Sequence, residues 1–201
     1  MGASISHTLL HVPPAALQSI GTASANRSQL AVALRSTVIV FDLSSSSLAP
    51  AAQCELDQEV ACLDVSPPPG AESSALVLVS LWGDLSLRLL DAATLAEQSR
   101  QLLGGDIVAQ SARLMTLEGK CYAVVGMGDG VLHYCQVMEG GSCLGAVRSM
   151  PLGIRPVELV PFTAAPVAGS GPADGAAQQQ QQQQQLLAIS DRPAVITATA
   201  A

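Results

Sequence analysis

Three glycines surround an aspartate in the stretch YAVVGMGDGVLHY, residues 122–134. Glycine-rich loops can cradle the phosphates of a nucleotide, because their backbone N–H groups approach the ligand without obstruction by side chains. That chemistry requires G-x-G-x-x-G at the start of a helix, whereas this stretch reads G-x-G-x-G and leads into a strand-like apolar run. We therefore interpret Asp129 and Gly130 as a hairpin turn, with both residues supplying the positive φ that such turns need.

The other residues with reactive side chains form no recognisable catalytic or metal site. The histidines His7, His11 and His133 are separated in sequence and lack evident partners. The five cysteines have no C-x-x-C spacing, which indicates small apolar residues in a reducing compartment and neither a zinc site nor a disulfide framework; they are Cys54, Cys62, Cys121, Cys135 and Cys143. The sequence predicts no metal, no cofactor and no enzyme activity. A nucleotide-binding enzyme remains a third hypothesis, under which Asp129→Asn abolishes an activity without unfolding the chain.

Composition restricts the partners of this chain of 201 residues. Hydrophobic residues make up 49%, aromatic residues 2% and charged residues 12%, so much of the chain must be buried. Nine basic against 16 acidic residues give a formal charge of −7, which disfavours direct binding to nucleic acid. No apolar stretch reaches the ~18 residues of a membrane span. The opening MGASIS fits the myristoylation pattern, but this pattern is so loose that we interpret the match as coincidental.

Pairs of short apolar runs joined by tight polar turns recur along the chain. Each run is rich in Val, Leu and Ile and is bounded by turn-forming residues, which is typical of a β-hairpin. Successive turns are separated by 48, 46 and 62 residues. The turns lie at Arg35 and Ser36, Gly83 and Asp84, Asp129 and Gly130, and Asp191 and Arg192.

The longest interval contains a segment of different composition. Residues 166–185 are rich in Gly, Pro and Ala and end in eight consecutive glutamines, which we interpret as a disordered surface loop. Subtracting these 20 residues leaves 42, close to the other two intervals. A period of about 45 residues is typical of a blade of a β-propeller.

Each predicted hairpin is preceded by another short apolar segment and followed by a more polar one. The preceding segments are residues 20–24, 60–65, 107–115 and 157–162, and residues 94–103 exemplify the polar stretch, which we predict to be an edge strand. Four strands per unit indicate an all-β fold, a partial β-propeller of about three to four WD-like four-stranded blades. A β-sandwich is the alternative fold, although no 45-residue period is expected there.

The repeat divides the chain into four parts. We expect an N-terminal lead-in at 1–16, β-propeller blades at 17–165, the low-complexity poly-Gln insert at 166–185, and the truncated start of the remaining part of the last blade at 186–201. Closed propellers have at least four blades. The sequence therefore predicts a fragment of a larger multi-propeller protein.

Six short stretches occur together in an order that resembles one protein family. The chain resembles, over residues 17–197 apart from the insert, the second β-propeller of the large subunit of the UV-damaged DNA-binding protein. The superfamily also includes the large cleavage-and-polyadenylation specificity factor subunit and a splicing factor 3b subunit. The stretches are EVACLDVSP (59–67), LWGDLSLRLL (81–90), LLGGDIV (102–108), GMGDGVLHY (126–134), PLGIRPVEL (151–159) and SDRPAVI (190–196).

The resemblance implies a non-enzymatic adaptor of a cullin-type ubiquitin ligase, linked to DNA damage recognition and repair and located in the nucleus and also the cytoplasm. In that family the second propeller holds the N-terminal region of a type-4 cullin, while the other two propellers, which this chain does not match, receive WD-repeat substrate receptors. DNA is contacted chiefly by a smaller partner. The alternative is a scaffold subunit of the mRNA cleavage and polyadenylation or splicing machinery.

Two cullin-facing residues carry over by motif. They are Glu59, from EVACLD, and Trp82, from the LW-D motif, with Val60 as a neighbour on the same surface. Trp82 is the only tryptophan and lies beside a predicted turn, where an indole often anchors an interface. Without the resemblance, we would favour a Trp82 that caps the core beneath its blade. The poly-Gln insert departs from the family pattern but falls in a loop.

Overall fold

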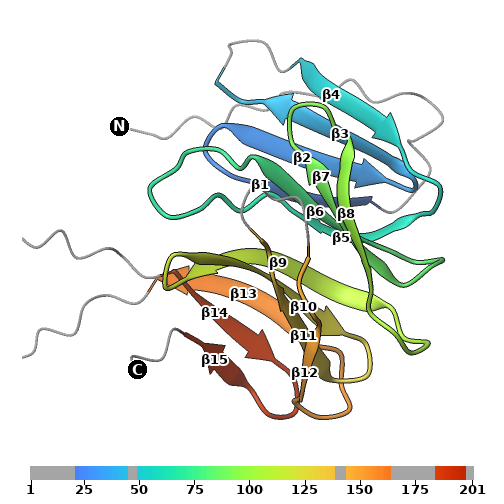
Figure 1. Cartoon of the computed structure of the whole chain (residues 1–201), viewed down its shortest axis with the longest axis vertical. Coiled ribbons are helices and arrows are strands. Elements are labelled where there is room, and N and C mark those ends of the chain that lie inside the picture. The colour runs from blue at the N-terminus through green and yellow to red at the C-terminus, as the bar shows by residue number, and fades with distance from the viewer. Residues whose placement is uncertain (1–20, 45–48, 139–143, 164–183, 198–201) are drawn as a thin grey trace, which may run out of the picture.

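The computed structural model describes residues 21–44, 49–138, 144–163 and 184–197, and every regular element among them is a β-strand (Figure 1). The strands form four antiparallel sheets, here called blades 1 to 4. In each blade the strands pair in chain order. The prediction of an all-β partial propeller is confirmed.

The first two blades contain four strands each. Blade 1 consists of β1 (Gly21–Ala25), β2 (Gln29–Leu34), β3 (Thr37–Asp42) and β4 (Pro50–Glu55). Blade 2 consists of β5 (Val60–Asp64), β6 (Leu76–Leu81), β7 (Ser86–Asp91) and β8 (Glu97–Leu102). The polar stretch at 94–103 is therefore an edge strand, as predicted, and not a helix.

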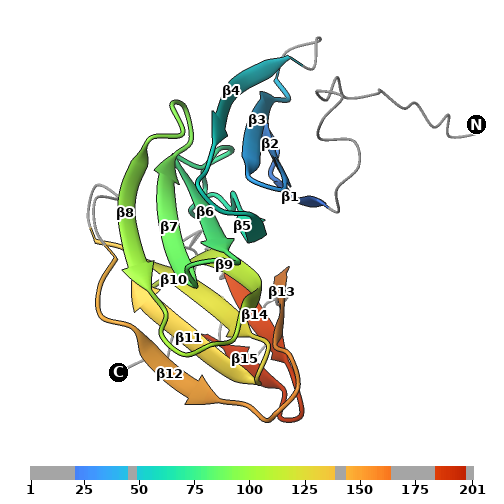
Figure 2. The same ribbon diagram turned by 90° about the vertical axis from the view of Figure 1, so that its right-hand side faces the viewer.

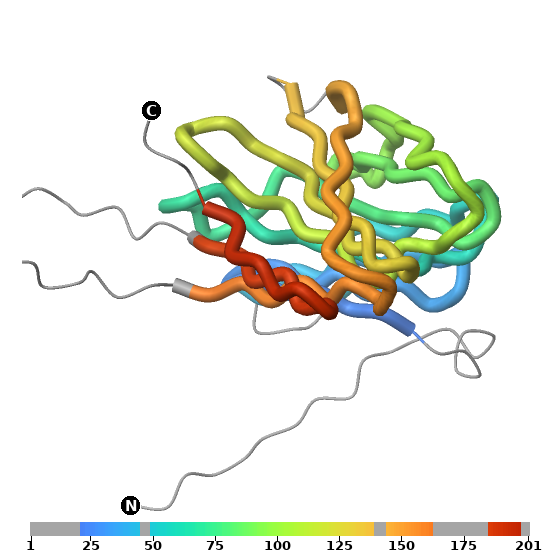
Figure 3. Tube along the Cα trace, turned by 90° about the horizontal axis from the view of Figure 1, so that it is seen from below, coloured from blue at the N-terminus to red at the C-terminus, as the bar shows by residue number. Residues whose placement is uncertain are grey.

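Blade 3 also has four strands, and blade 4 has three among the residues described. Blade 3 consists of β9 (Ala109–Leu117), β10 (Lys120–Met127), β11 (Val131–Gln136) and β12 (Arg148–Pro151). Blade 4 consists of β13 (Glu158–Thr163), β14 (Gln184–Ile189) and β15 (Ala194–Ile196). Figure 3 shows β14 and β15, in red, beside the orange β13.

The first strands of successive blades lie side by side, β1 beside β5, β5 beside β9, and β9 beside β13 (Figure 2). Three apolar clusters fill the spaces between blades 1 and 2, 2 and 3, and 3 and 4. A middle strand of blade 2 is therefore covered on both faces, which explains the uninterrupted apolar run LVLV in β6. Outer strands β4 and β8 alternate between exposed and half-buried residues.

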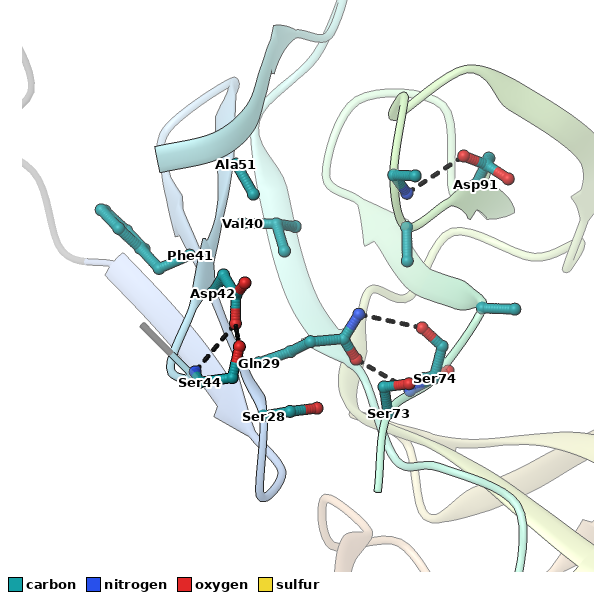
Figure 4. Close-up of a pocket in the computed structure, with 13 residues that line it drawn as sticks. Ser28, Gln29, Val40, Phe41, Asp42, Ser44, Ala51, Ser73, Ser74 and Asp91 are labelled. Carbon is teal, nitrogen blue, oxygen red and sulfur yellow. Dashed lines mark hydrogen bonds between the residues drawn. The ribbon is translucent and has the colours of Figure 1, made fainter. Parts of the chain in front are cut away.

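Hydrogen bonds between neighbouring blades repeat with the sequence period. The Ser111 hydroxyl donates to the carbonyl of Val157, 46 residues later, at 2.7 Å. The Gln29 amide group donates to the carbonyl of Ser74 at 3.0 Å and accepts from its N–H at 2.8 Å, across 45 residues (Figure 4). Apolar packing between blades is non-directional, so these hydrogen bonds determine how one blade is positioned against the next.

The hairpin turns differ in detail from the sequence prediction. Gly130 has a φ of 87°, but Asp129 is not among the residues with positive φ. The Gly130 N–H lies 3.4 Å from the carbonyl of Met127, so the loop is a turn followed by one left-handed residue, which requires a single positive φ. In the second hairpin Leu85, not Gly83, is left-handed, with a φ of 49°.

Parts of the predicted domain division lie outside the described residues, namely 1–16 and 164–183. The insert falls within the hairpin of β13 and β14, in which Thr163 pairs with Gln184. Because β14 begins at Gln184, the last two glutamines of the tract belong to a strand.

Candidate docking surface

All the predicted hairpin turns lie on one side of the blades. The antiparallel strand order places the turn between the second and third strands of a blade beside the connection to the next blade. Backbone bonds join the turn to this connection, as where the Leu103 N–H donates to the carbonyl of Leu85 at 3.1 Å. They also join it to the preceding connection, as where the Trp82 N–H donates to the carbonyl of Glu59 at 2.9 Å. We call this side the turn face, made of residues 35–36, 56–59, 82–85, 103–108, 128–130, 152–157 and 190–193.

Trp82 is exposed on the turn face, directly after the last residue of β6. Its side chain is 52% exposed, whereas Leu81 beside it is fully buried. Trp82 belongs to none of the apolar clusters between blades. The bond from its N–H to Glu59 fixes the backbone while the indole remains in solvent. This exposure favours an interface role over the interpretation in which Trp82 caps the core.

Glu59 lies next to Trp82 and forms an ion pair with Arg35 of the first hairpin turn. The Arg35 Nε and Glu59 Oε1 atoms are 3.0 Å apart, and both side chains are more than half exposed. An exposed pair of this kind contributes at most ~1 kcal/mol. A partner can therefore bind either side chain, and breaking the ion pair then costs little free energy.

Val60 does not share this exposure. Only 9% of its surface is accessible, and its side chain packs into the cluster between blades 1 and 2. Contact of Val60 with a partner stays a prediction, for which its buried side chain offers little accessible surface. Val60 is the first residue of β5 and packs between blades 1 and 2, whereas Glu59 lies in the connection before this strand.

A buried arginine supports the loop that carries Trp82. The side chain of Arg88, in β7, is 5% exposed and lies 2.8 Å from a carboxylate oxygen of Asp57 and 2.8 Å from one of Asp84. Glu97 is 3.1 Å away, and Arg100 also contacts Asp84. We did not predict this cluster, although an arginine inside the apolar run LSLRLL is a signal for buried ion pairing.

The electrostatics of this cluster favour ionised carboxylates. Burial acts to raise the pKa of Asp84, but hydrogen bonds from Ser86 and Arg88 outweigh it and lower the pKa to about 2. Hydrogen bonding to Arg88 lowers the pKa of Asp57 as well. Removing one of these carboxylates would leave the buried positive charge of Arg88 less well neutralised. The cluster therefore holds the Trp82 loop in one conformation.

The aspartates of the turns accept hydrogen bonds from backbone N–H groups. Asp84 and Asp129 each accept a hydrogen bond from the N–H two residues later, at 3.0 and 3.1 Å. Asp191 accepts from the N–H groups of Ile154 and Arg155, at 2.8 and 3.2 Å, and so links the last hairpin turn to the connection before β13. These contacts give the aspartates structural roles.

Further exposed apolar side chains lie at the turn face or on its border, among them Ile154, Ile107 and Leu102. Ile154 is 86% exposed, Ile107 lies in the connection after blade 2, and Leu102 ends β8. Apolar side chains gathered on one side, rimmed by charged residues, are typical of a protein interaction surface.

The described residues offer no alternative chemical site. No group of three or more His, Cys, Asp or Glu side chains among them could hold a metal ion. Burial raises the pKa of Cys62 to about 12 and those of Cys121 and Cys135 to about 11, which keeps these thiols protonated. Among these residues no helix has the length and apolar character needed to cross a membrane.

One cavity lies away from the turn face, between blades 1 and 2 (Figure 4). It has a volume of about 460 Å³ and contains the carboxylates of Asp42 and Asp91. Each carboxylate bonds to its own turn, Asp42 to Ser44 and Asp91 to Thr94. These two groups are structural and show no catalytic arrangement.

Comparison with known proteins decides the family. A sequence model described as the RSE1/DDB1/CPSF1 second beta-propeller matches residues 6–201. The chain belongs to this family. The resemblance drawn from six short stretches is confirmed, and both Glu59 and Trp82 lie within the matched region.

Individual relatives are DNA damage-binding proteins. The chain is 32% identical to DNA damage-binding protein 1 of Oryza sativa subsp. japonica over 72% of its length, and 31% identical to that of Drosophila melanogaster over 74%. It is 29% identical to DNA damage-binding protein 1b of Arabidopsis thaliana over 89%. The matched regions cover 14%, 13% and 15% of these relatives, so the chain corresponds to a small part of their length.

Proposed function

We propose that this chain is a non-enzymatic scaffold module of a cullin-type ubiquitin ligase linked to DNA damage recognition and repair, acting in the nucleus and also the cytoplasm. Its turn face docks the N-terminal region of the cullin. The family of second propellers and the names of the damage-binding relatives support a scaffold role. The exposed Trp82 on a rigid loop is the single observation that carries the proposed docking site.

The geometry around Trp82 suits an interface anchor. An exposed indole offers a large apolar surface with few rotatable bonds, and the Arg88 cluster fixes the loop beneath it. The ion pair of Arg35 and Glu59 places one positive and one negative charge beside Trp82. Complementary charges on a partner would fix its position relative to this surface. WD-repeat receptors would bind other propellers of a longer protein, and this acidic segment would not contact DNA directly.

The proposal is tested by measuring the affinity of the chain for the N-terminal region of a type-4 cullin by isothermal titration calorimetry. We expect Trp82→Ala to weaken binding by at least ~30-fold, equivalent to ~2 kcal/mol. The matched control is Met138→Ala, since Met138 is 48% exposed but lies off the turn face. Equal affinities of wild type and Trp82→Ala would remove Trp82 from the site.

A second candidate function is a scaffold in mRNA cleavage and polyadenylation or splicing. The matching family description, which joins RSE1, DDB1 and CPSF1, supports it. Affinity capture of the endogenous protein from nuclear extract, followed by mass spectrometry, separates the two functions. Recovery of polyadenylation or splicing factors without a cullin would favour this second candidate.

A further inference from the structure

The turn face continues from Trp82 to blade 3 as one connected surface. The Leu103 N–H bonds to the carbonyl of Leu85 at 3.1 Å, which joins the Trp82 loop to the connection after blade 2. That connection is joined in turn to blade 3, because the Gly128 N–H donates to the carbonyl of Val108 at 3.1 Å. A partner that contacts Trp82 therefore has a continuous surface beside it.

Two isoleucines flank the turn of blade 3, residues 128–130. Ile107 is 42% exposed, and a Cβ atom on Gly128 would lie 3.1 Å from its Cγ2 atom. Ile154 is 86% exposed, and its backbone nitrogen would lie 2.8 Å from a Cβ atom on Gly130. Because the two glycines have no side chains, both isoleucines lie close to the turn while their apolar surface remains in solvent.

The isoleucine patch, which we define as Asp106, Ile107, Asp129 and Ile154, contains two exposed carboxylates. Neither Asp106 nor Asp129 forms an ion pair with another described residue. The Asp129 carboxylate accepts a hydrogen bond from the N–H of Val131 at 3.1 Å, which does not neutralise its charge. The other acidic side chains of the turn face are all paired with arginine, namely Asp57, Glu59, Asp84 and Asp191.

The titratable groups near the patch leave this negative charge in place. Burial lowers the pKa of His133, and the opposing attraction to Asp129 is the smaller effect, so this imidazole is uncharged at neutral pH. Arg155 pairs with Asp191 at 3.2 Å. Arg192 belongs to the turn of blade 4, where its N–H bonds to the connection before β13. The negative charge is therefore concentrated on the side of the patch nearest blade 2.

The patch is complete within the described residues. Its segments join blades 2, 3 and 4, and each of these blades is described on both sides of its turn. The strand ends that border residues 45–48, 139–143 and 164–183 lie on the opposite side of the blades, because these residues follow β3, β11 and β13.

We propose that the isoleucine patch binds a basic, aliphatic segment of the same partner that docks at Trp82, a proposal that rests on the docking described above. Lysine or arginine side chains of this segment pair with Asp106 and Asp129, and its aliphatic side chains cover the two isoleucines. Charge complementarity determines the occupant. An acidic segment would be repelled by two unpaired carboxylates, and a purely apolar one would bury them without compensation.

The experiment measures the rates at which the N-terminal region of a type-4 cullin binds the full 201-residue chain, by surface plasmon resonance. We expect Asp106→Asn combined with Asp129→Asn to slow association at least ~5-fold in ~0.05 M salt and less than ~2-fold in ~0.5 M salt, since salt screens the attraction. The asparagine at 129 keeps an oxygen that can accept from Val131. The matched control is Glu72→Gln combined with Glu118→Gln, which removes two exposed carboxylates on the opposite side of the blades.

The apolar half of the patch is tested through dissociation. We expect Ile154→Ala to speed dissociation at least ~5-fold, because losing buried apolar contacts acts chiefly on this rate. Met138→Ala is the control, since Met138 is exposed but lies off the turn face. Circular dichroism checks that each variant is folded, and the high exposure of Ile154 makes its replacement harmless to the fold.

The outcomes separate this proposal from the docking at Trp82. Wild-type rates for the patch variants, together with lost binding in Trp82→Ala, would overturn the patch and retain the docking. Failure of the wild-type chain to bind the cullin would overturn both. Faster association of the aspartate variant would indicate an acidic segment, and an equal effect of the glutamate control would indicate attraction to the acidic chain as a whole. Either result would overturn the assignment of a basic segment to this patch.

Discussion

The carboxylate of Asp64 in β5 accepts a hydrogen bond from the N–H of Leu114 in β9 at 2.8 Å, across 50 residues of sequence. The same carboxylate accepts from the Ser24 hydroxyl in β1 at 3.0 Å and from the Arg113 guanidinium at 3.2 Å. Asp64 is 1% exposed. One buried side chain therefore links the first strands of three successive blades.

Replacement of Asp64 should destabilise the fold. We expect Asp64→Ala to lower the free energy of unfolding by about 3 kcal/mol, because several buried donors and one arginine lose their acceptor. Urea denaturation followed by circular dichroism measures the change. Asp106→Ala, at an exposed aspartate, is the control and should alter the free energy by less than ~0.5 kcal/mol. Similar midpoints for the two variants would contradict the linking role.

Substitutions of the adjacent residues Leu81 and Trp82 should differ strongly in their effect on stability. We expect Trp82→Ala to change the free energy of unfolding by less than ~0.5 kcal/mol, because Trp82 is 52% exposed and belongs to none of the clusters between blades. Leu81→Ala should cost ~2–5 kcal/mol, because Leu81 is fully buried and its truncation leaves a cavity. Thermal unfolding of both variants measures the contrast. A large loss of stability in Trp82→Ala would argue for a core role instead.

Asp84 should make part of the stability depend on pH. Its pKa is about 2 in the folded chain, against 3.8 for the unperturbed group. Its contribution, roughly 1–2 kcal/mol, is therefore present above pH ~4 and lost as the pH falls towards ~2. We expect the difference in unfolding free energy between wild type and Asp84→Asn to shrink over this range in urea titrations. A difference independent of pH would show that Asp84 is not held ionised.

The turn at Gly130 should tolerate no side chain. A Cβ atom on Gly130 would lie 2.5 Å from the carbonyl of Gly153, and the φ of 87° is unfavourable for other residues. Gly119 has a similar φ of 74° but open space around it. We expect Gly119→Ala to cost ~1 kcal/mol and Gly130→Ala roughly 3 kcal/mol, as measured by chemical denaturation. Equal costs would mean that backbone strain alone governs both positions.

Local patterns in the sequence were sufficient to predict the blades. The first strands expected at 20–24, 60–65, 107–115 and 157–162 match β1, β5, β9 and β13 within a few residues. This works because strand length, turn chemistry and the repeat period are properties of neighbouring residues.

Contacts between distant residues could not be predicted in the same way. The network of Asp64 and the cluster around Arg88 join residues from different strands and blades, and no spacing rule identifies such partners. Val60 was predicted as a neighbour of Glu59 on the cullin-facing surface, and the burial of its side chain depends on the packing of blade 1 against blade 2. The same packing between blades determines which apolar residues are exposed to solvent, as Trp82 is.

The sequential packing of blades has a consequence for how the chain unfolds. Among the described residues each blade shares apolar clusters with its neighbours, so a nearest-neighbour model of coupled repeats describes their energetics. Blades 2 and 3 each share two of these clusters, and blades 1 and 4 each share one. Asp64 strengthens the coupling among blades 1 to 3, which leaves blade 4 the weakest unit. Native-state hydrogen exchange should therefore reveal subglobal opening that begins at blade 4, with a lower free energy than global unfolding.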